Sequence, residues 1–185
     1  MAVLILGLIL FLGAHSLRMA LPRWRSGFIG GRGEGPFKGM VALSSILGLV
    51  LIIWGFASSE LVPVYVPPAW GATVAAVLMA PALILAIASV APPGYIKRAV
   101  VNPLLLATIL WAGGHLLSNG DLAGVVLFGA FLVWSVIDWA RQPAADPIPS
   151  PSSRSDVIAI AAGLVVYAVL VWRLHLWLFG VPPLV

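Results

Sequence analysis

The chain alternates between long apolar stretches and short polar segments. Six apolar stretches can be separated, and they cover residues 2–21, 39–57, 70–90, 103–118, 122–139 and 156–179. A helix that crosses the hydrocarbon core of a bilayer needs about 20 residues, within a range of about 17–25. The fourth and fifth stretches are close to the lower limit. The pattern predicts an all-α, polytopic membrane helix bundle with six transmembrane helices, in a single domain over residues 1–185.

The segments between the stretches have the composition of connections. They are rich in proline, glycine and charge, and they read "RWRSGFIGGRGEGPFK", "VPVYVPPAW", "APPGYIKRAVVNP", "SNGD" and "RQPAADPIPSPSSRSD". Proline and glycine interrupt helices, so each segment is expected to be a loop, the last one linker-like. The positive charges near the N-terminus follow the first apolar stretch instead of preceding it. This order favours a retained helix over a cleaved signal peptide.

Composition places the chain in a membrane. Hydrophobic residues make up 62% of its 185 residues and charged residues only 9%, whereas soluble domains average about 25% charged residues. We therefore expect an integral membrane protein whose first partner is the lipid bilayer. The absence of cysteine excludes disulfides, thiolate metal sites and iron–sulfur clusters.

The charges also predict a topology. Nine of the ten basic residues lie in the first, third and fifth connections and the adjoining stretch ends. By the positive-inside rule these connections face the cytoplasm and both termini face the periplasm. The net charge of +4 thus reflects topology, and no nucleic-acid partner is expected. The first connection, with Arg23, Arg25, Arg32 and Lys38, is expected to touch anionic lipid.

Polar groups inside the apolar stretches are the candidates for function, because they are costly in lipid. His15 and Arg18 share one face of the first helix, and Trp111 and His115 share one face of the fourth. Imidazole suits haem or a metal ion. The alternative is a neutral histidine that bonds across helices, with Gly113 and Gly114 allowing close packing.

The surroundings of the two histidines resemble each other. "ILFLGAHSL" at 9–17 and "ILWAGGHLL" at 109–117 are identical at five of nine positions, as an inverted repeat of a transporter could produce. From the centres of the two stretches, His15 and His115 would differ by roughly 12 Å in depth. One haem along the membrane normal would fit such a pair only if it were tilted or the first helix were off-centre.

Polar residues nearer the ends of the stretches have simpler explanations. Asn119-Gly120 is typical of a turn, and Asp121 is expected to cap the next helix. Asp138 is expected to be solvated at the cytoplasmic interface, and His175 to be interfacial. The sequence contains no HExxH motif, no paired-carboxylate set and no ATP-binding motif.

Two segments resemble the NnrU domain family, and the similarity covers nearly the whole chain. The first segment is "AHSLRMALPRWRSGFIGGRGEGPFKGMVALSSILGLVLIIWGF", and the second is "NPLLLATILWAGGHLLSNGD", of which Trp111 to Asp121 is the most specific part. The resemblance implies a bacterial inner-membrane protein linked to denitrification and nitric-oxide metabolism. The family includes the plant zeta-carotene isomerase, which uses haem b.

By this resemblance His15 and His115 are the axial-ligand candidates for haem b. Arg18, Trp111, Asn119 and Asp121 are supporting candidates. The chain departs from the isomerase at Ala112, where that enzyme has cysteine, and from the family at Asn102, where His-Pro is common. Thiolate ligation and a third histidine are therefore not expected, and carotene isomerisation is not carried over.

Several functions are compatible with the sequence. The first is a haem protein with a redox-linked or isomerase-like role, whose enzymatic status the sequence does not decide. The second is a non-enzymatic accessory or assembly factor for a denitrification reductase or another membrane protein. Less favoured alternatives are a small transporter and, more remotely, a methyltransferase-like membrane fold.

Overall fold

The computed structural model describes residues 1–142 and 150–183, and the described chain is mainly helical. Residues 143–149 of the predicted linker lie outside the described part. The elements are α1 (Ala2–Ala20), α2 (Pro22–Arg32), α3 (Glu34–Ala57), α4 (Gly71–Val90), α5 (Tyr95–Ala99), α6 (Pro103–Ser118), α7 (Leu122–Ala140), α8 (Ser153–Val169), the π-helical η1 (Leu170–Leu174) and α9 (His175–Phe179). All six predicted apolar stretches are helical.

Five helices are long and apolar enough to cross a membrane. They are α1, α3, α4, α7 and the continuous helical run 153–179 that joins α8, η1 and α9. The remaining apolar helix, α6, has 16 residues, and at 1.5 Å per residue it is about 24 Å long. The membrane class and the all-helical fold are therefore confirmed. Six crossings and the periplasmic position of both termini stay predictions.

The prediction of a loop between the first two apolar stretches is wrong. Residues 22–32 form α2, and α3 begins at Glu34 rather than at 39. Pro22 ends α1 and occupies the first turn of α2, where its missing N–H costs nothing. Gly33, at φ +85°, then allows the sharp change of direction into α3. Aromatic packing holds α2 in place in spite of its glycines, as described below.

The contacts divide the chain into two compact units. The first unit comprises residues 1–64 and 121–130, and the second comprises residues 65–120 and 131–185. Helix α7 begins in the first unit and continues in the second. His15 therefore belongs to the first unit and His115 to the second.

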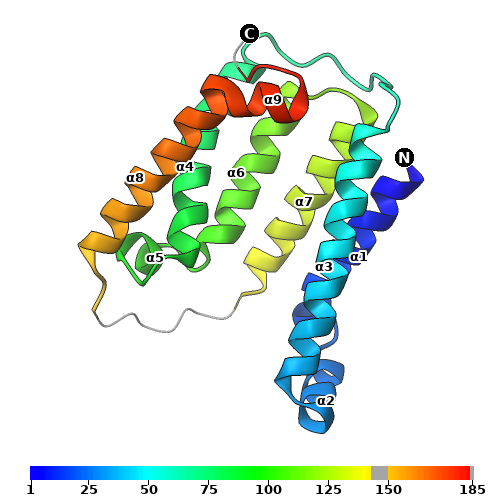
Figure 1. Cartoon of the computed structure of the whole chain (residues 1–185), viewed down its shortest axis with the longest axis vertical. Helices are drawn as coiled ribbons and strands as arrows, with labels where there is room; N and C mark the ends of the chain where they lie inside the picture. Colours follow the sequence, from blue (N-terminus) through cyan, green and yellow to red (C-terminus); the bar gives the residue numbers. More distant parts are fainter. Residues whose placement is uncertain (143–149, 184–185) are drawn as a thin grey trace. The chain divides into compact units, whose positions relative to one another are not determined.

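In the first unit, α1 packs along α3 through a seam of glycines, with α2 at the end of the pair (Figure 1). A Cβ added at Gly48 would lie 2.7 Å from the Phe11 backbone nitrogen, and one at Gly55 would overlap the backbone nitrogen of Leu4. A Cβ added at Gly7 would meet the Ile52 nitrogen at 2.6 Å. Small residues let membrane helices approach closely enough for extensive van der Waals contact, so this seam sets the position of α1.

In the second unit, α4 packs against both α6 and α8 (Figure 1). A Cβ at Gly114 of α6 would lie 3.1 Å from the Met79 methyl group, and one at Gly163 of α8 would lie 2.7 Å from the Ile84 Cα. These contacts confirm the packing role expected of Gly114. A Cβ at Gly113, by contrast, would meet no heavy atom of the described residues within 4 Å.

The two ends of the second unit are tied by hydrogen bonds. At one end the Tyr65 hydroxyl donates to the carbonyls of Leu116 and Asn119, the latter at 2.9 Å. At the other end both carboxylate oxygens of Asp156 accept backbone N–H groups, from Tyr95 at 2.8 Å and Ile96 at 3.1 Å. The connections thus hold the helix ends on either side of the apolar core.

Candidate functional site

His15 lies in the last turns of α1 and is held by the residue one turn earlier. Its Nδ1 is 2.8 Å from the Phe11 carbonyl oxygen. The Phe11 ring stacks on the imidazole with a centroid separation of 4.6 Å and an interplanar angle of 27°. The side chain is exposed on the structure described. A carbonyl can only accept, so Nδ1 carries a proton, and the neutral form of the ring has its lone pair on Nε2.

His115, near the end of α6, is held by the same kinds of contact. Its Nδ1 is 2.8 Å from the Trp111 carbonyl oxygen, and the Trp111 ring lies 5.4 Å from the imidazole. Trp111 is braced in turn by Phe131, whose ring meets it edge-on at 5.4 Å and 87°. His115 is half-buried. Its neutral ring also has the lone pair on Nε2.

His175 is held from the opposite direction along the chain, and the Phe179 ring, four residues later, lies 4.9 Å from its imidazole. Its Nδ1 lies 2.8 Å from the carbonyl oxygen of Val181, six residues later, where the chain turns after α9. It belongs to the same unit as His115. All three histidines therefore have Nδ1 on a carbonyl and a neighbouring aromatic ring, but only at His15 and His115 does a single residue four positions earlier supply both.

Two of the supporting residues shape the segment after α6. The Asn119 backbone N–H and its side-chain amide both donate to the His115 carbonyl, each at 2.8 Å, and this ends α6. Asp121 accepts the Gly124 N–H at 2.9 Å, so the predicted cap of α7 is confirmed. Of the candidates around His115, the structure brings Trp111 and Asn119 into direct contact with it.

Arg18 is the remaining supporting residue, and Asn102 is the position where the family commonly has histidine. Arg18 lies in the last turn of α1, three residues after His15. Asn102, where the family commonly has histidine, accepts the Leu105 N–H at 3.1 Å and caps α6. The pairing of His15 with His115 stays a prediction.

Asp138 on α7 is a polar residue whose environment was predicted wrongly from the sequence. Only 7% of its surface is exposed, so the expectation of a solvated carboxylate is wrong. Ser135, one turn earlier, is fully buried, and its hydroxyl has no hydrogen-bond partner among the described residues. The three-residue spacing of Ser135 and Asp138 predicts that they share one face of the helix. Whether that face is buried depends on how α7 packs against other helices.

The donor set decides which metal chemistry the chain can hold. Across residues 1–142 and 150–183, no three His, Cys, Asp or Glu side chains gather as a metal site. A bare catalytic zinc ion uses three protein ligands, whereas haem iron needs only one or two axial side chains. Imidazoles whose Nδ1 is anchored to a carbonyl are the form that metal-bound histidines take. The donors present fit haem.

The comparison with known proteins agrees with the resemblance noted from the sequence. No curated protein and no solved structure matches the chain. The family profile described as "NnrU protein" matches residues 3–183, nearly the whole chain. That match includes both histidine segments and all the helices described above except the first residue of α1. The chain belongs to the NnrU protein family.

Proposed function

We propose that this NnrU-family membrane protein binds haem b through His15, His115 or both, and has a redox-linked or isomerase-like role. The supporting observation is the common construction of these two positions. In each, a carbonyl four residues earlier holds Nδ1 and an aromatic ring packs on the imidazole. As the family resemblance implies, the proposed setting is the bacterial inner membrane, in denitrification and nitric-oxide metabolism.

The construction matters because it prepares the imidazole before any ligand arrives. The hydrogen bond selects the tautomer that presents Nε2 and orients the ring. The aromatic ring restricts rotation about the histidine side chain, so less conformational entropy is lost on ligation. Haem, when bound, would supply one-electron chemistry, while the chain provides the ligand atoms and a water-poor setting.

The first test is optical. The protein, purified in detergent from haem-replete cells, is expected to show a Soret band, and His15→Ala and His115→Ala are each expected to weaken it strongly. His175→Ala is the matched control, because it removes a histidine of different construction, and it should keep the band. Colourless wild-type protein would overturn the proposal. If His175→Ala lost the band and His15→Ala kept it, His175 rather than His15 would be the ligand.

A second candidate function rests on the same hydrogen bonds. The Nδ1–carbonyl bonds already satisfy one polar atom of each ring inside an apolar helix, so they could serve helix stability alone. The protein would then be an accessory factor for a denitrification reductase. Co-purification with a reductase, together with normal nitrogen-oxide reduction in cells carrying both alanine variants, would favour this role over the haem protein.

A further inference from the structure

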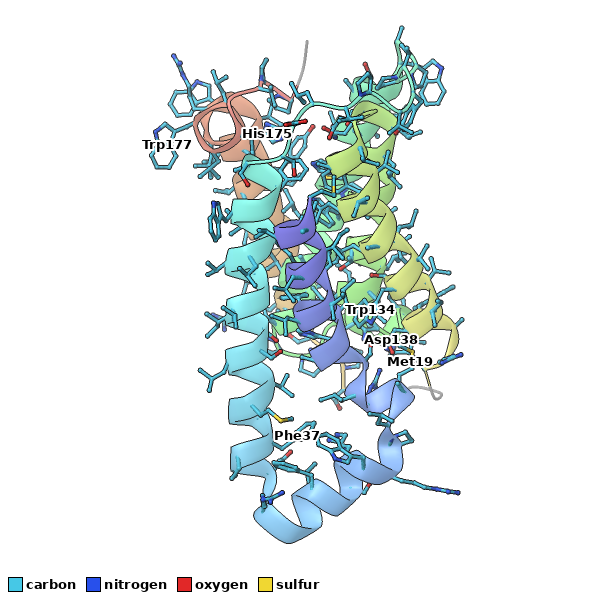
Figure 2. All side chains as sticks on the ribbon, turned by 90° about the vertical axis from the view of Figure 1, so that its right-hand side faces the viewer. Met19, Phe37, Trp134, Asp138, His175 and Trp177 are labelled. Carbon is cyan, nitrogen blue, oxygen red and sulfur yellow. The ribbon has the colours of Figure 1, made fainter. Side chains whose placement is uncertain are left out.

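Helix α2 carries an aromatic cluster that the proposed haem site does not use. Phe37, at the start of α3, is buried and points toward α2 (Figure 2). Its ring lies 6.0 Å from that of Phe28 and 6.5 Å from that of Trp24, and Trp24 and Phe28 lie 5.4 Å apart. Trp24 remains 45% exposed. The cluster therefore fixes α2 against α3 and presents one indole at the surface.

Two arginines pack on the rings of this cluster. The guanidinium of Arg25 lies 5.4 Å from the centre of the Phe37 ring, and that of Arg32 lies 5.2 Å from the centre of the Phe28 ring. Seven residues separate them, so they share one face of α2 about 10 Å apart along its axis. A guanidinium packed on an aromatic ring is held in place while its N–H groups can still form the paired hydrogen bonds that suit phosphate.

The charge around the cluster is strongly one-sided. Residues 1–59 contain five basic side chains and a single acidic one, Glu34. Glu34 forms an ion pair with Lys38 at 3.3 Å within α3. The net positive charge of this end of the unit is therefore carried by arginines, and it is complementary to an anionic partner.

The packing of α1 on α3 shows where the aromatic cluster lies relative to the end of the α1 span. The Ser44 hydroxyl donates to the Leu10 carbonyl at 3.1 Å, and Gly48 and Gly55 meet Phe11 and Leu4. Continuing this register places the end of α1 level with the first turns of α3. The 19 residues of α1 measure about 28 Å, close to the ~30 Å of a hydrocarbon core. The cluster thus begins where that span ends, at the depth where tryptophan and arginine anchor membrane proteins.

We infer that α2 and the first turns of α3 form a binding site for the headgroup of an anionic glycerophospholipid. Arg25 and Arg32 bind its phosphate oxygens, and Trp24 lies at the boundary with the acyl chains. The site is independent of haem. It differs from the uniform attraction of a basic loop, because aromatic rings hold two of the three arginines of α2, Arg25 and Arg32.

Native mass spectrometry of the detergent-purified protein tests this inference. The protein is mixed with equal amounts of phosphatidylglycerol and phosphatidylcholine, and bound lipids are counted. Wild-type protein is expected to prefer phosphatidylglycerol. Each arginine near an anionic lipid surface is worth about fivefold in binding, so Arg25→Gln/Arg32→Gln should reduce the preference by about 25-fold at most and about fivefold at least.

Arg23→Gln is the matched control. It removes the same charge from the same helix, two residues from Arg25 and therefore on the opposite side of α2. It should reduce the preference less than Arg25→Gln alone or Arg32→Gln alone. Circular dichroism and size-exclusion profiles establish that the variants are folded. The conservative variant Arg25→Lys/Arg32→Lys guards against misfolding and should be intermediate.

Three outcomes would overturn the site. The first is equal binding of the two lipids by wild-type protein, which would leave an acidic protein as the partner of this surface. The second is an equal loss in Arg23→Gln and the double variant, which would show unlocalised attraction. The third is an unchanged preference in a folded double variant.

Discussion

Gly48→Ala tests whether the glycine seam between α1 and α3 positions the His15 arrangement. The added Cβ would lie 2.7 Å from the Phe11 nitrogen and 2.9 Å from the Phe11 Cβ and the Gly7 oxygen, whereas ordinary contact begins at 3.4 Å. The backbones must therefore separate by about 0.7 Å, and overpacking of this kind costs about 1–3 kcal/mol. Alanine offsets part of that cost, because it favours a helix over glycine by up to ~1 kcal/mol.

Gly39→Ala is the matched control, because Gly39 lies on the same helix and an added Cβ would meet no described heavy atom within 4 Å. Both substitutions gain the same helix propensity, so the difference between the variants isolates the overpacking cost of about 1–3 kcal/mol. Reversible unfolding in mixed micelles, titrated with sodium dodecyl sulfate and followed by circular dichroism, measures it. Equal stability of the two variants would refute the packing argument.

The same pair of variants reports on the proposed haem site. Gly48→Ala presses on Phe11, whose carbonyl and ring hold His15. We expect its haem content to fall below that of Gly39→Ala, measured as Soret absorbance per protein at a temperature where both are folded. A folded Gly48→Ala protein with full haem content would show that the position of Phe11 does not matter for ligation.

Three further predictions follow from other contacts. Asp121→Ala removes the cap of α7 and should lower the free energy of unfolding by about 0.5–2 kcal/mol, while Asp121→Asn should nearly preserve it; thermal unfolding distinguishes them. Asp156→Ala removes the acceptor for two backbone N–H groups and should destabilise the protein by about 1–3 kcal/mol, an effect that a shift in melting temperature would reveal and an unchanged one would contradict. The cysteine-free chain allows single cysteines at Ser26 and Ser59: with an impermeant maleimide on intact spheroplasts, only the Ser59→Cys variant should be labelled if the predicted topology is right.

Much of the helical architecture was predictable because it depends on local composition. Twenty or so apolar residues in succession leave the backbone no water to bond with, so a helix is the outcome whatever its neighbours are. The cap at Asp121 is equally local. Helix α2 was missed for the opposite reason: its glycines and charges argue against a helix, and the aromatic contacts that stabilise it include Phe37 on the following helix.

The same division holds for the candidate site. The sequence alone determined that His15 and His115 each follow an aromatic residue by one helical turn, and a helix then brings carbonyl and imidazole together. Only the tertiary structure decided which glycines serve packing between helices, since a Cβ added at Gly114 would press on Met79, whereas one added at Gly113 would meet no atom of another described helix within 4 Å. It also decided that Asp138 is buried. The physical reason is range: hydrogen bonds within a helix turn join residues four apart, whereas burial and close approach depend on which other helix lies alongside, and no local pattern encodes that.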